Sequence, residues 1–568
     1  MQEQQFCCIN PHAECLKGAD EGFEKPLTKN ISAISAISEN YFKSVSFFSD
    51  NCGFIFAAIM EKKVRVRFAP SPTGGLHLGG VRTVLYNYLF AKQHNGQFVL
   101  RIEDTDQNRY VPGAEEYIYE CLKWCDLEPD ESPLHGGPYT PYRQSERKEM
   151  YGQYAEQLVK QGNAYYAFDT PEQLDAMREK FRTEENPSPQ YNHSIRGKMW
   201  NSLTLARDEV HRLLNEGTLY VIRIKMPENE TLTFTDLIRG EVSFDSSLSD
   251  DKVLLKADGM PTYHLAVVVD DYSMKISHAF RGEEWLPSTP VHLLLWKYLG
   301  WYEDMPQWAH LPLILKPDGH GKLSKRDGDR LGFPVFAMNW KDPKNEELIK
   351  GFRELGFLPE AFINVLAVLG WNDGTEQEIF SKEELIERFS LENVHKGGAK
   401  FNYEKAKWFN HEWIKKLPVD RWQMTVRKDF EQKGVIVQDE EKFIKVLELV
   451  KERCILLTDF WQQAAFFFVA PDTLDVGSIK QKWNDDKAIF FDVVAEKFTL
   501  LEEWNAANIE TLFKDTATEK GIKMGELQLP FRIMLVGGKY GPTVFDIAQL
   551  IGKEETIARI RKGLTEIG

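Results

Sequence analysis

The chain has 568 residues, of which 42% are hydrophobic and 27% charged, and its formal net charge at pH 7 is −16. This length exceeds what one hydrophobic core supports, so several domains are expected. The acidic balance argues against a protein coated in basic residues that binds polyanions in general, although it does not exclude a local basic face.

Residues 1–59 are rich in Ser, Asn and Cys and show no clear period. We expect them to belong to no folded domain, because they lack the apolar pattern that offsets the entropy of ordering. Met60 stands just before the first predicted strand and is expected to be the natural start. A mitochondrial transit peptide is disfavoured, since the stretch carries acids and no Arg before Arg65. A regulatory or partner-binding extension is the alternative.

The first folded unit is predicted to be a strand, a glycine-rich loop, a helix and a second strand. Apolar and basic residues alternate over 64–68, as in a strand with one buried face. The helix is expected over 81–96 and the second strand over 97–104. This βαβ order predicts a parallel sheet, and open α/β folds bind ligands at such strand-to-helix turns. A helix N-terminus there attracts an anion.

The rest of the chain alternates and then becomes helical. A helix is expected over 113–125, and residues 163–255 mix short strands and helices like an inserted α+β region. The sheet is expected to resume over 260–282, which contains two strand-like runs. From about residue 330 the pattern is helical to the end.

The cysteines and apolar runs indicate the compartment. Seven Cys occur, and four of them lie in the first 60 residues. They are too few and too uneven for a disulfide framework, which predicts a reducing cytoplasm. No apolar run approaches the ~20 residues that cross a bilayer, so no membrane partner is expected.

Two loops carry groups suited to phosphates. In "PSPTGGLHLGG" the glycines let backbone N–H groups approach a phosphate, and His77 can donate to one of its oxygens. "KLSKR" supplies two lysines. Neither is a Walker A loop, because G-x-x-x-x-G-K-[ST] is absent. Taken singly, the first loop is typical of an ordinary turn and the second of a solvated surface run. A His-Gly loop after the first strand followed by a Lys loop after the last strand favours a nucleotide site. The residues are Pro70, Ser71, Pro72, Thr73, Gly74, Gly75, Leu76, His77, Leu78, Gly79 and Gly80, then Lys322, Leu323, Ser324, Lys325 and Arg326.

These loops and five further motifs resemble the class I aminoacyl-tRNA synthetases, specifically the bacterial-type glutamyl-tRNA synthetases. "HLGG" stands where the family has its HIGH motif, with Gly80 in place of the last His, and "KLSKR" stands where it has KMSKS. The resemblance runs from about Met60 to the C-terminus and is strongest over the catalytic half. The other motifs are "RFAPSPTG" (67–74), "RIEDTD" (101–106), "GPYTPYRQSER" (137–147), "DGMPTYHLAVVVDD" (258–271) and "RGEEWLPSTP" (281–290).

The resemblance implies an α/β fold: a Rossmann-type parallel-sheet catalytic domain with an α+β insertion, followed by a mostly α-helical anticodon-binding half. A glutaminyl enzyme is expected to end in β-barrels, whereas residues 531–564 read as a loop followed by helices. The expected regions are two catalytic halves (60–162 and 256–315), an acceptor-end-binding insertion (163–255), the second loop with a stem-contact region (316–399) and the anticodon-binding region (400–568).

The resemblance also implies the reaction. ATP would activate L-glutamate to glutamyl-adenylate with release of pyrophosphate, and the glutamyl group would pass to the 3′ end of tRNA(Glu), in a cytoplasmic monomer. A carboxylate is already a nucleophile, so the first step needs positioning and electrostatic stabilisation rather than a general base. The expected catalytic residues are His77, Lys322 and Lys325, and the expected ATP contacts are His77, Gly79, Trp285 and Lys325. Core packing is the alternative for Trp285.

Five positions match the family's amino-acid pocket: Arg67, Ser71, Glu103, Tyr263 and Arg281. Guanidinium groups bind carboxylates bidentately, so the two arginines are expected to hold the carboxylates of glutamate. Glu103 is expected to meet the ammonium, and the two hydroxyls to assist. The alternatives are a solvated strand arginine for Arg67 and a capping or surface acid for Glu103.

No metal held by the protein is expected. Mg²⁺ is expected to be carried by ATP. Many relatives hold zinc in the insertion with closely spaced Cys, but the corresponding stretches 165–170 and 191–196 contain none, and thiolates are what select zinc. Cys121 and Cys125 are interpreted as packing residues, and structural capping is favoured over metal binding for Asp104 and Asp106.

Three other functions are alternatives. A glutaminyl-tRNA synthetase or a small-molecule adenylyltransferase shares the His loop, but the long helical part after the Lys loop speaks against the latter. A non-catalytic RNA-binding relative is expected to have lost His77 or the loop lysines, and this chain has both. The sequence does not locate the anticodon contacts, and so leaves open whether tRNA(Gln) is also charged.

Overall fold

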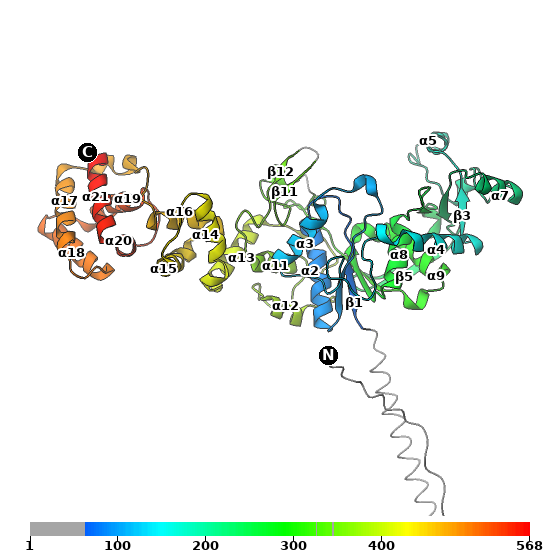
Figure 1. Ribbon diagram of the computed structural model, residues 1–568, viewed down its shortest axis with the longest axis horizontal. Helices are drawn as coiled ribbons and strands as arrows, with labels where there is room; N and C mark the ends of the chain where they lie inside the picture. Colours follow the sequence, from blue (N-terminus) through cyan, green and yellow to red (C-terminus); the bar gives the residue numbers. More distant parts are fainter. Residues whose placement is uncertain (1–62, 325–326, 344–345) are drawn as a thin grey trace, which may run out of the picture. The chain divides into compact units, whose positions relative to one another are not determined.

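The computed structural model describes residues 63–324, 327–343 and 346–568 (Figure 1). The predictions for residues 1–59, Lys325 and Arg326 fall outside the described residues. Residues Lys63–Gly568 form one unit by their contacts. The domain boundaries expected within it stay predictions.

The central sheet has six strands in the order β2-β1-β8-β9-β5-β6. Strand β1 (Arg65–Phe68) pairs in parallel with β2 (Gln97–Leu100) and with β8 (His278–Gly282), which in turn pairs in parallel with β9 (Gln307–Leu311). Helix α2 (Leu78–Gln93) connects β1 to β2 and packs on both. The predicted βαβ unit and parallel α/β core are therefore confirmed. The helix begins earlier than the sequence predicted, directly after His77.

One predicted strand is wrong. Residues 263–273 form helix α8 (Tyr263–Ser273), so 260–282 holds a single strand, β8. Every side chain from Leu265 to Asp271 is buried. A helix buried on all sides carries the same unbroken apolar run as a buried strand, and periodicity does not separate the two.

The predicted insertion builds a sheet of its own and also extends the central one. Strands β5 (Thr231–Asp236) and β6 (Gly240–Asp245) form an antiparallel hairpin, and Asp236 lies in register with Trp308 of β9. The hairpin thereby brings Asp236 into the core. The strands of the separate antiparallel sheet are β3 (Ala164–Ala167), β4 (Val221–Ile224) and β7 (Val253–Leu255).

Further helices cover the sheets. Helix α2 packs on α11 and α12, and α8 packs on α4 and α9. Their bounds are α3 (Ala114–Trp124), α4 (Lys148–Lys160), α5 (Pro171–Lys180), α6 (His193–Arg196), α7 (Arg207–Asn215), α9 (Thr289–Tyr298), α10 (Asp327–Leu331), α11 (Pro359–Val368) and α12 (Lys382–Arg388). Short two-stranded pairs join β10 (Ile314–Leu315) to β13 (Ala399–Lys400) and β11 (Trp340–Lys341) to β12 (Leu348–Ile349).

From α13 (Tyr403–Lys416) onwards the chain is helical, as predicted, and is drawn from yellow to red in Figure 1. The helices that follow are α14 (Gln423–Gln432), α15 (Glu440–Val450), α16 (Phe460–Ala464), α17 (Asp485–Leu500), α18 (Ala506–Glu519), α19 (Met524–Val536), α20 (Val544–Ile551) and α21 (Lys553–Ile567). The helical prediction from about residue 330 is wrong between α10 and α11, where the described residues form no helix and include β11 and β12. The loop predicted to open 531–564 is shorter than expected, because Phe531 to Val536 complete α19. Gly537 ends that helix with φ 85°, a left-handed conformation that favours glycine.

Candidate active site

A cavity of about 1030 Å³ opens where β1, β8 and β9 end. This is the edge of a parallel sheet at which α/β folds bind ligands. All five residues predicted to bind glutamate line it: Arg67, Ser71, Glu103, Tyr263 and Arg281. His77, Gly79, Trp285 and Lys322 line it too, whereas Lys325 lies outside the described residues. Of the first loop, Gly74, Gly75 and Leu78 do not line it.

His77 caps the helix whose N-terminus meets the cavity. Its Nδ1 accepts the backbone N–H of Gly79 at 3.1 Å, which makes it the N-cap residue of α2. With Nδ1 as the acceptor, the neutral ring carries its proton on Nε2. A Cβ at Gly75 would lie 2.6 Å from the ring of Phe336, so close packing alone requires that glycine. The loop thus presents a ring and a helix N-terminus, as an anion requires.

The second loop is held by two carboxylates. Lys322 Nζ donates to Glu284 Oε1 at 2.6 Å, and both side chains are half-exposed. Glu284 belongs to a short 3₁₀ helix (Glu283–Ser288) that follows β8. The Oγ and backbone N–H of Ser324 both donate to Asp327 at the start of α10. Lys322 therefore lies on the cavity wall with a protein partner in place.

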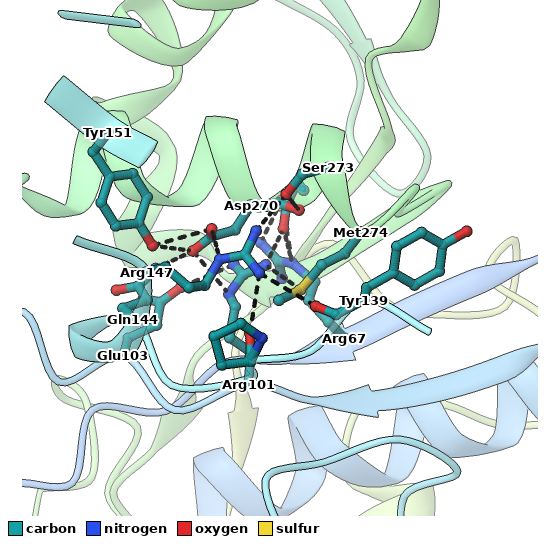
Figure 2. A network of polar contacts seen from close by, with 12 residues as sticks. Arg67, Arg101, Glu103, Tyr139, Gln144, Arg147, Tyr151, Asp270, Ser273 and Met274 are labelled. Atoms are coloured by element: carbon teal, nitrogen blue, oxygen red, sulfur yellow. Dashed lines mark hydrogen bonds and ion pairs between the residues drawn. The ribbon is translucent and has the colours of Figure 1, made fainter. Parts of the chain in front are cut away.

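Arg67 belongs to a buried network of charges behind the cavity wall (Figure 2). Its Nε donates to Asp271 Oδ1 at 3.1 Å, and Arg101 donates to the same oxygen at 2.8 Å. Arg101 also donates to Glu103 at 3.0 Å. Arg67, which is predicted to bind a substrate carboxylate, thus already has a carboxylate partner in Asp271. Its side chain is not solvated, which was the alternative, because the residue is only 5% exposed.

Asp270 is the second centre of this network. Arg147 Nε and Gln144 Nε2 each donate to it at 2.8 Å, and the hydroxyl of Tyr151 donates at 3.0 Å (Figure 2). Arg147 and Gln144 come from the motif "GPYTPYRQSER", so part of that motif anchors the buried network. Three arginines face three carboxylates here, and pairing of this kind offsets the cost of burying charge.

Glu103 and Asp104 have different surroundings. Burial raises the pKa of Glu103, and Arg101 opposes the rise. Glu103 keeps its place on the cavity wall, which rules out the surface alternative. Asp104 accepts the backbone N–H and the Oγ of Ser145 at 2.8 and 2.6 Å, the structural capping that the sequence favoured. Asp106 precedes the short 3₁₀ helix Gln107–Arg109, but its side chain makes no capping hydrogen bond there.

Arg281 differs from Arg67 in its partners. It is 7% exposed and forms no ion pair with a carboxylate of the described residues. Its four acceptors are all neutral: His310 Nε2 at 2.9 Å, His292 Nδ1 at 3.1 Å, Thr289 Oγ1 at 3.1 Å and Tyr263 Oη at 3.3 Å. A buried cation without an anion is costly. A ligand carboxylate in the cavity would supply that anion.

Trp285 stands at the surface of the cavity. It is 42% exposed, and its ring centroid lies 4.7 Å from that of Tyr263. The core-packing alternative is therefore wrong for Trp285. Packing is confirmed for Cys121 and Cys125, which are buried and unpaired. No three His, Cys, Asp or Glu side chains in the described part of the chain are arranged to hold a metal ion.

Sequence reasoning missed most of the buried polar residues that support the site. They are Arg101, Asp236, Asp270, Asp271, His292 and His310. The sequence carries one signal: Arg101 and Asp270-Asp271 directly follow apolar runs, in segments that the sequence predicts as strands. A charge in such a run is rare unless it is paired. No local signal marks the role of Asp236, because its side-chain partner His310 lies far along the chain.

Comparisons with known proteins agree with this geometry. Residues 63–408 match the model of the catalytic domain of class I tRNA synthetases (E and Q), and residues 404–564 match that of an anticodon binding domain. A glutamate–tRNA ligase of Amoebophilus asiaticus is 51% identical over 89% of this chain and 98% of its own length. One of Flavobacterium psychrophilum is 52% identical over 89% of this chain and 100% of its own.

Solved structures show the same likeness. The crystal structure of a glutamate tRNA ligase from Elizabethkingia meningosepticum, in complex with its amino acid, superposes with a TM-score of 0.84 at 49% identity, covering 89% of this chain and 100% of that one. The glutamate-tRNA synthetase of Elizabethkingia anophelis gives 0.81 at 49% identity with the same coverage.

Proposed function

The chain belongs to the glutamate–tRNA ligases, in the E and Q group of class I tRNA synthetases, and we propose how the residues of its cavity carry out that reaction. The ligase joins L-glutamate to tRNA(Glu) in two steps with ATP as the energy source. The observation that carries the proposal is Arg281, a buried guanidinium on the cavity wall whose partners are all neutral. It requires an anion, and glutamate brings two carboxylates.

The amino acid is held by charges of both signs. Arg281 binds one carboxylate, and Arg67, held in place by Asp271, faces the other. Glu103 accepts hydrogen bonds from the ammonium group. The hydroxyls of Tyr263 and Ser71 complete the pocket. Glutamate is thereby oriented with its α-carboxylate towards the first loop.

The first step requires positioning and charge stabilisation. The α-carboxylate attacks the α-phosphorus of ATP, its new P–O bond replacing the bond to the pyrophosphate oxygen. His77 and the N-terminal amides of α2 hold the phosphates beside Gly79. Lys322 and Lys325 offset the charge on the departing pyrophosphate. Trp285 packs beside the adenine.

In the second step, the terminal ribose 2′-OH of tRNA attacks the glutamyl carbonyl, and AMP leaves. We propose that the helical region from α13 onwards binds the anticodon. Mg²⁺ is carried by the phosphates of ATP rather than by a set of protein ligands. We further propose that the chain works as a cytoplasmic monomer without zinc. No described helix is long and apolar enough to cross a bilayer.

Pyrophosphate exchange tests the proposal. The purified protein is assayed with glutamate, with glutamine and without amino acid, each with and without tRNA(Glu). Of the two amino acids, we expect only glutamate to support exchange, and we expect that exchange to require tRNA(Glu). Exchange with glutamine at a comparable rate would instead identify a glutaminyl enzyme, and absence of exchange with every amino acid would contradict catalysis altogether.

A further inference from the structure

Arg281 is the end of a buried chain of hydrogen bonds that begins on another strand. Its Nε donates to His310 Nε2 at 2.9 Å, and His310 Nδ1 donates to Asp236 Oδ2 at 2.5 Å. We propose that Asp236 and His310 are positioning residues that aim Arg281 at glutamate, and so set the affinity for the amino acid; this rests on the proposed function. Neither residue lines the cavity.

The hydrogen bonds fix which ring nitrogen of His310 carries the proton. A guanidinium only donates, so His310 Nε2 must offer its lone pair to Arg281. The proton then lies on Nδ1, where Asp236 accepts it. A carboxylate that sets the tautomer of an imidazole in this way fixes its orientation as well.

Asp236 is itself held rigidly. Its Oδ1 accepts the backbone N–H groups of Ile238 and Arg239 at 3.0 and 2.9 Å, and Oδ2 accepts that of His310 at 3.1 Å. All its acceptor positions towards the protein are therefore used. These contacts keep the pKa of Asp236 below its usual value, although burial opposes the shift. The series of hydrogen bonds from Asp236 to Arg281 therefore starts from a residue that is fixed by the turn of the β5–β6 hairpin.

The second imidazole completes a neutral clamp on Arg281. His292 Nδ1 accepts from Arg281 Nη1 at 3.1 Å, opposite the contact with His310. Burial lowers the pKa of both His292 and His310, and the charge of Arg281 lowers it further. The hydrogen bond to Asp236 opposes the shift at His310, but its pKa stays below the usual value. Both rings therefore stay neutral acceptors at pH 7. They orient the guanidinium without supplying an anion, which leaves its charge for the ligand.

Substitutions at His310 separate this role from simple packing. His310→Phe keeps a ring in the core but removes the acceptor, whereas His310→Gln keeps an oxygen that Arg281 can reach. We expect His310→Phe to raise the KM for glutamate at least about tenfold, the size of a lost hydrogen bond to a charged group, with the KM for ATP unchanged. His310→Gln is expected to recover most of the affinity.

Asp236→Asn tests the other end of the chain. The NH₂ of the new Asn must face either the Nδ1–H of His310 or the backbone N–H groups of Ile238 and Arg239. An NH₂ cannot accept, so one of these hydrogen bonds is lost. We expect a similar rise in glutamate KM. Because the two residues act in series, the double variant with His310→Phe is expected to be no worse than the more affected single variant.

The matched control is His278→Phe, a largely buried imidazole on β8 that contacts Ser277 and Phe90 rather than Arg281. It is expected to leave the glutamate KM unchanged. All variants are first compared by thermal unfolding. If His310→Phe does not fold, His310→Gln and Asp236→Asn decide, because an unchanged glutamate KM in Asp236→Asn overturns the proposal on its own.

Two further results would overturn the proposal: an unchanged glutamate KM in folded His310→Phe, or an equal rise in the KM values for glutamate and ATP. The assays are run on a wild-type protein that has already shown exchange with glutamate. If the wild type shows none, the proposed function fails; if only the variants depart from expectation, the positioning role fails alone.

Discussion

The ammonium of Lys322 lies 2.6 Å from the carboxylate of Glu284, so a lysine expected to face the phosphates of ATP is already ion-paired within the protein. Both side chains are half-exposed, and ion pairs of that kind contribute only ~0–1 kcal/mol. A triphosphate carries more charge than one carboxylate. ATP is therefore expected to displace Glu284 from Lys322 when it binds.

Glu284→Gln tests this exchange. The change removes the competing charge, so the KM for ATP is expected to fall by about twofold to fivefold, the equivalent of a surface ion pair. The KM for glutamate is expected to stay constant. Glu209→Gln, which breaks an exposed ion pair with Arg212 on α7, serves as the control and is expected to change neither value. A higher KM for ATP in Glu284→Gln would mean that Glu284 assists ATP binding instead.

Lys325→Ala is predicted from the sequence, since Lys325 lies outside the described residues. Removing one charge from a departing pyrophosphate typically costs ~3–4 kcal/mol of barrier, or ~100- to 1,000-fold in rate. We expect this loss in kcat with the fold intact by circular dichroism. Turnover at the wild-type rate would remove Lys325 from the catalytic residues.

Glutamine is expected to be rejected as an amino-acid substrate. Arg281 has one N–H left beyond its four protein acceptors and offers the cavity no acceptor, so an amide NH₂ there stays unpaired. Sites with unmatched buried polar groups discriminate by ~10⁴ or more. The ratio of kcat/KM for glutamate to that for glutamine measures the effect. Arg281→Gln is expected to lower this ratio by lowering the value for glutamate. A similar kcat/KM for the two amino acids in the wild type would contradict the arginine pocket.

The residues that line the cavity were predicted from the sequence, whereas the buried residues that hold them in place were not. Arg67, Glu103 and Arg281 were predicted because they match the amino-acid pocket of the family that the sequence resembles, and the cavity includes all three. Their partners Asp271 and His310 come from segments that touch them only after folding. No local sequence pattern predicts such pairings, because the two partners lie far apart in the sequence.

The wrongly predicted strand has a similar cause. The run at 265–269 is apolar without a break, because α8 is enclosed by strand β7 and by its neighbouring helices α4 and α9. Its environment, rather than its composition, distinguishes it from a strand. The hairpin of β5 and β6 was likewise assigned to the insertion, although β5 pairs with the central strand β9.

The buried histidines predict how stability depends on pH. Burial lowers the pKa of His264 and of His278 from 6.5 to about 4. At a pH between about 4 and 6.5, the unfolded chain binds more protons at these histidines than the folded protein does. The free energy of unfolding therefore rises with pH in this range. The contribution is complete above about pH 6.5 and lost below about pH 4.

Urea unfolding between about pH 5 and 7 measures this slope. His278→Phe is expected to make the free energy of unfolding less dependent on pH in that window, by about 1–2 kcal/mol across it. The exposed His211 on α7 offers the control: His211→Gln is expected to keep the wild-type slope. An unchanged slope in His278→Phe would mean that this imidazole takes up protons in the folded protein as readily as in the unfolded chain.

Asp271 is expected to be the residue on which the buried network depends most. It accepts from Arg67 and from Arg101, and both guanidinium groups are buried. Asp271→Asn keeps the size of the side chain but leaves three buried positive charges facing two carboxylates. Removing one partner of a buried pair costs about 3–5 kcal/mol, because the remaining charge is left uncompensated. Urea unfolding is expected to show a loss of that size, with Asp175→Asn, from an exposed pair with Arg178, as a control that changes little. If instead the stability of Asp271→Asn matched that of the control, Arg67 and Arg101 would have to find compensation elsewhere, and Arg67 would not depend on Asp271 for its place in the cavity wall.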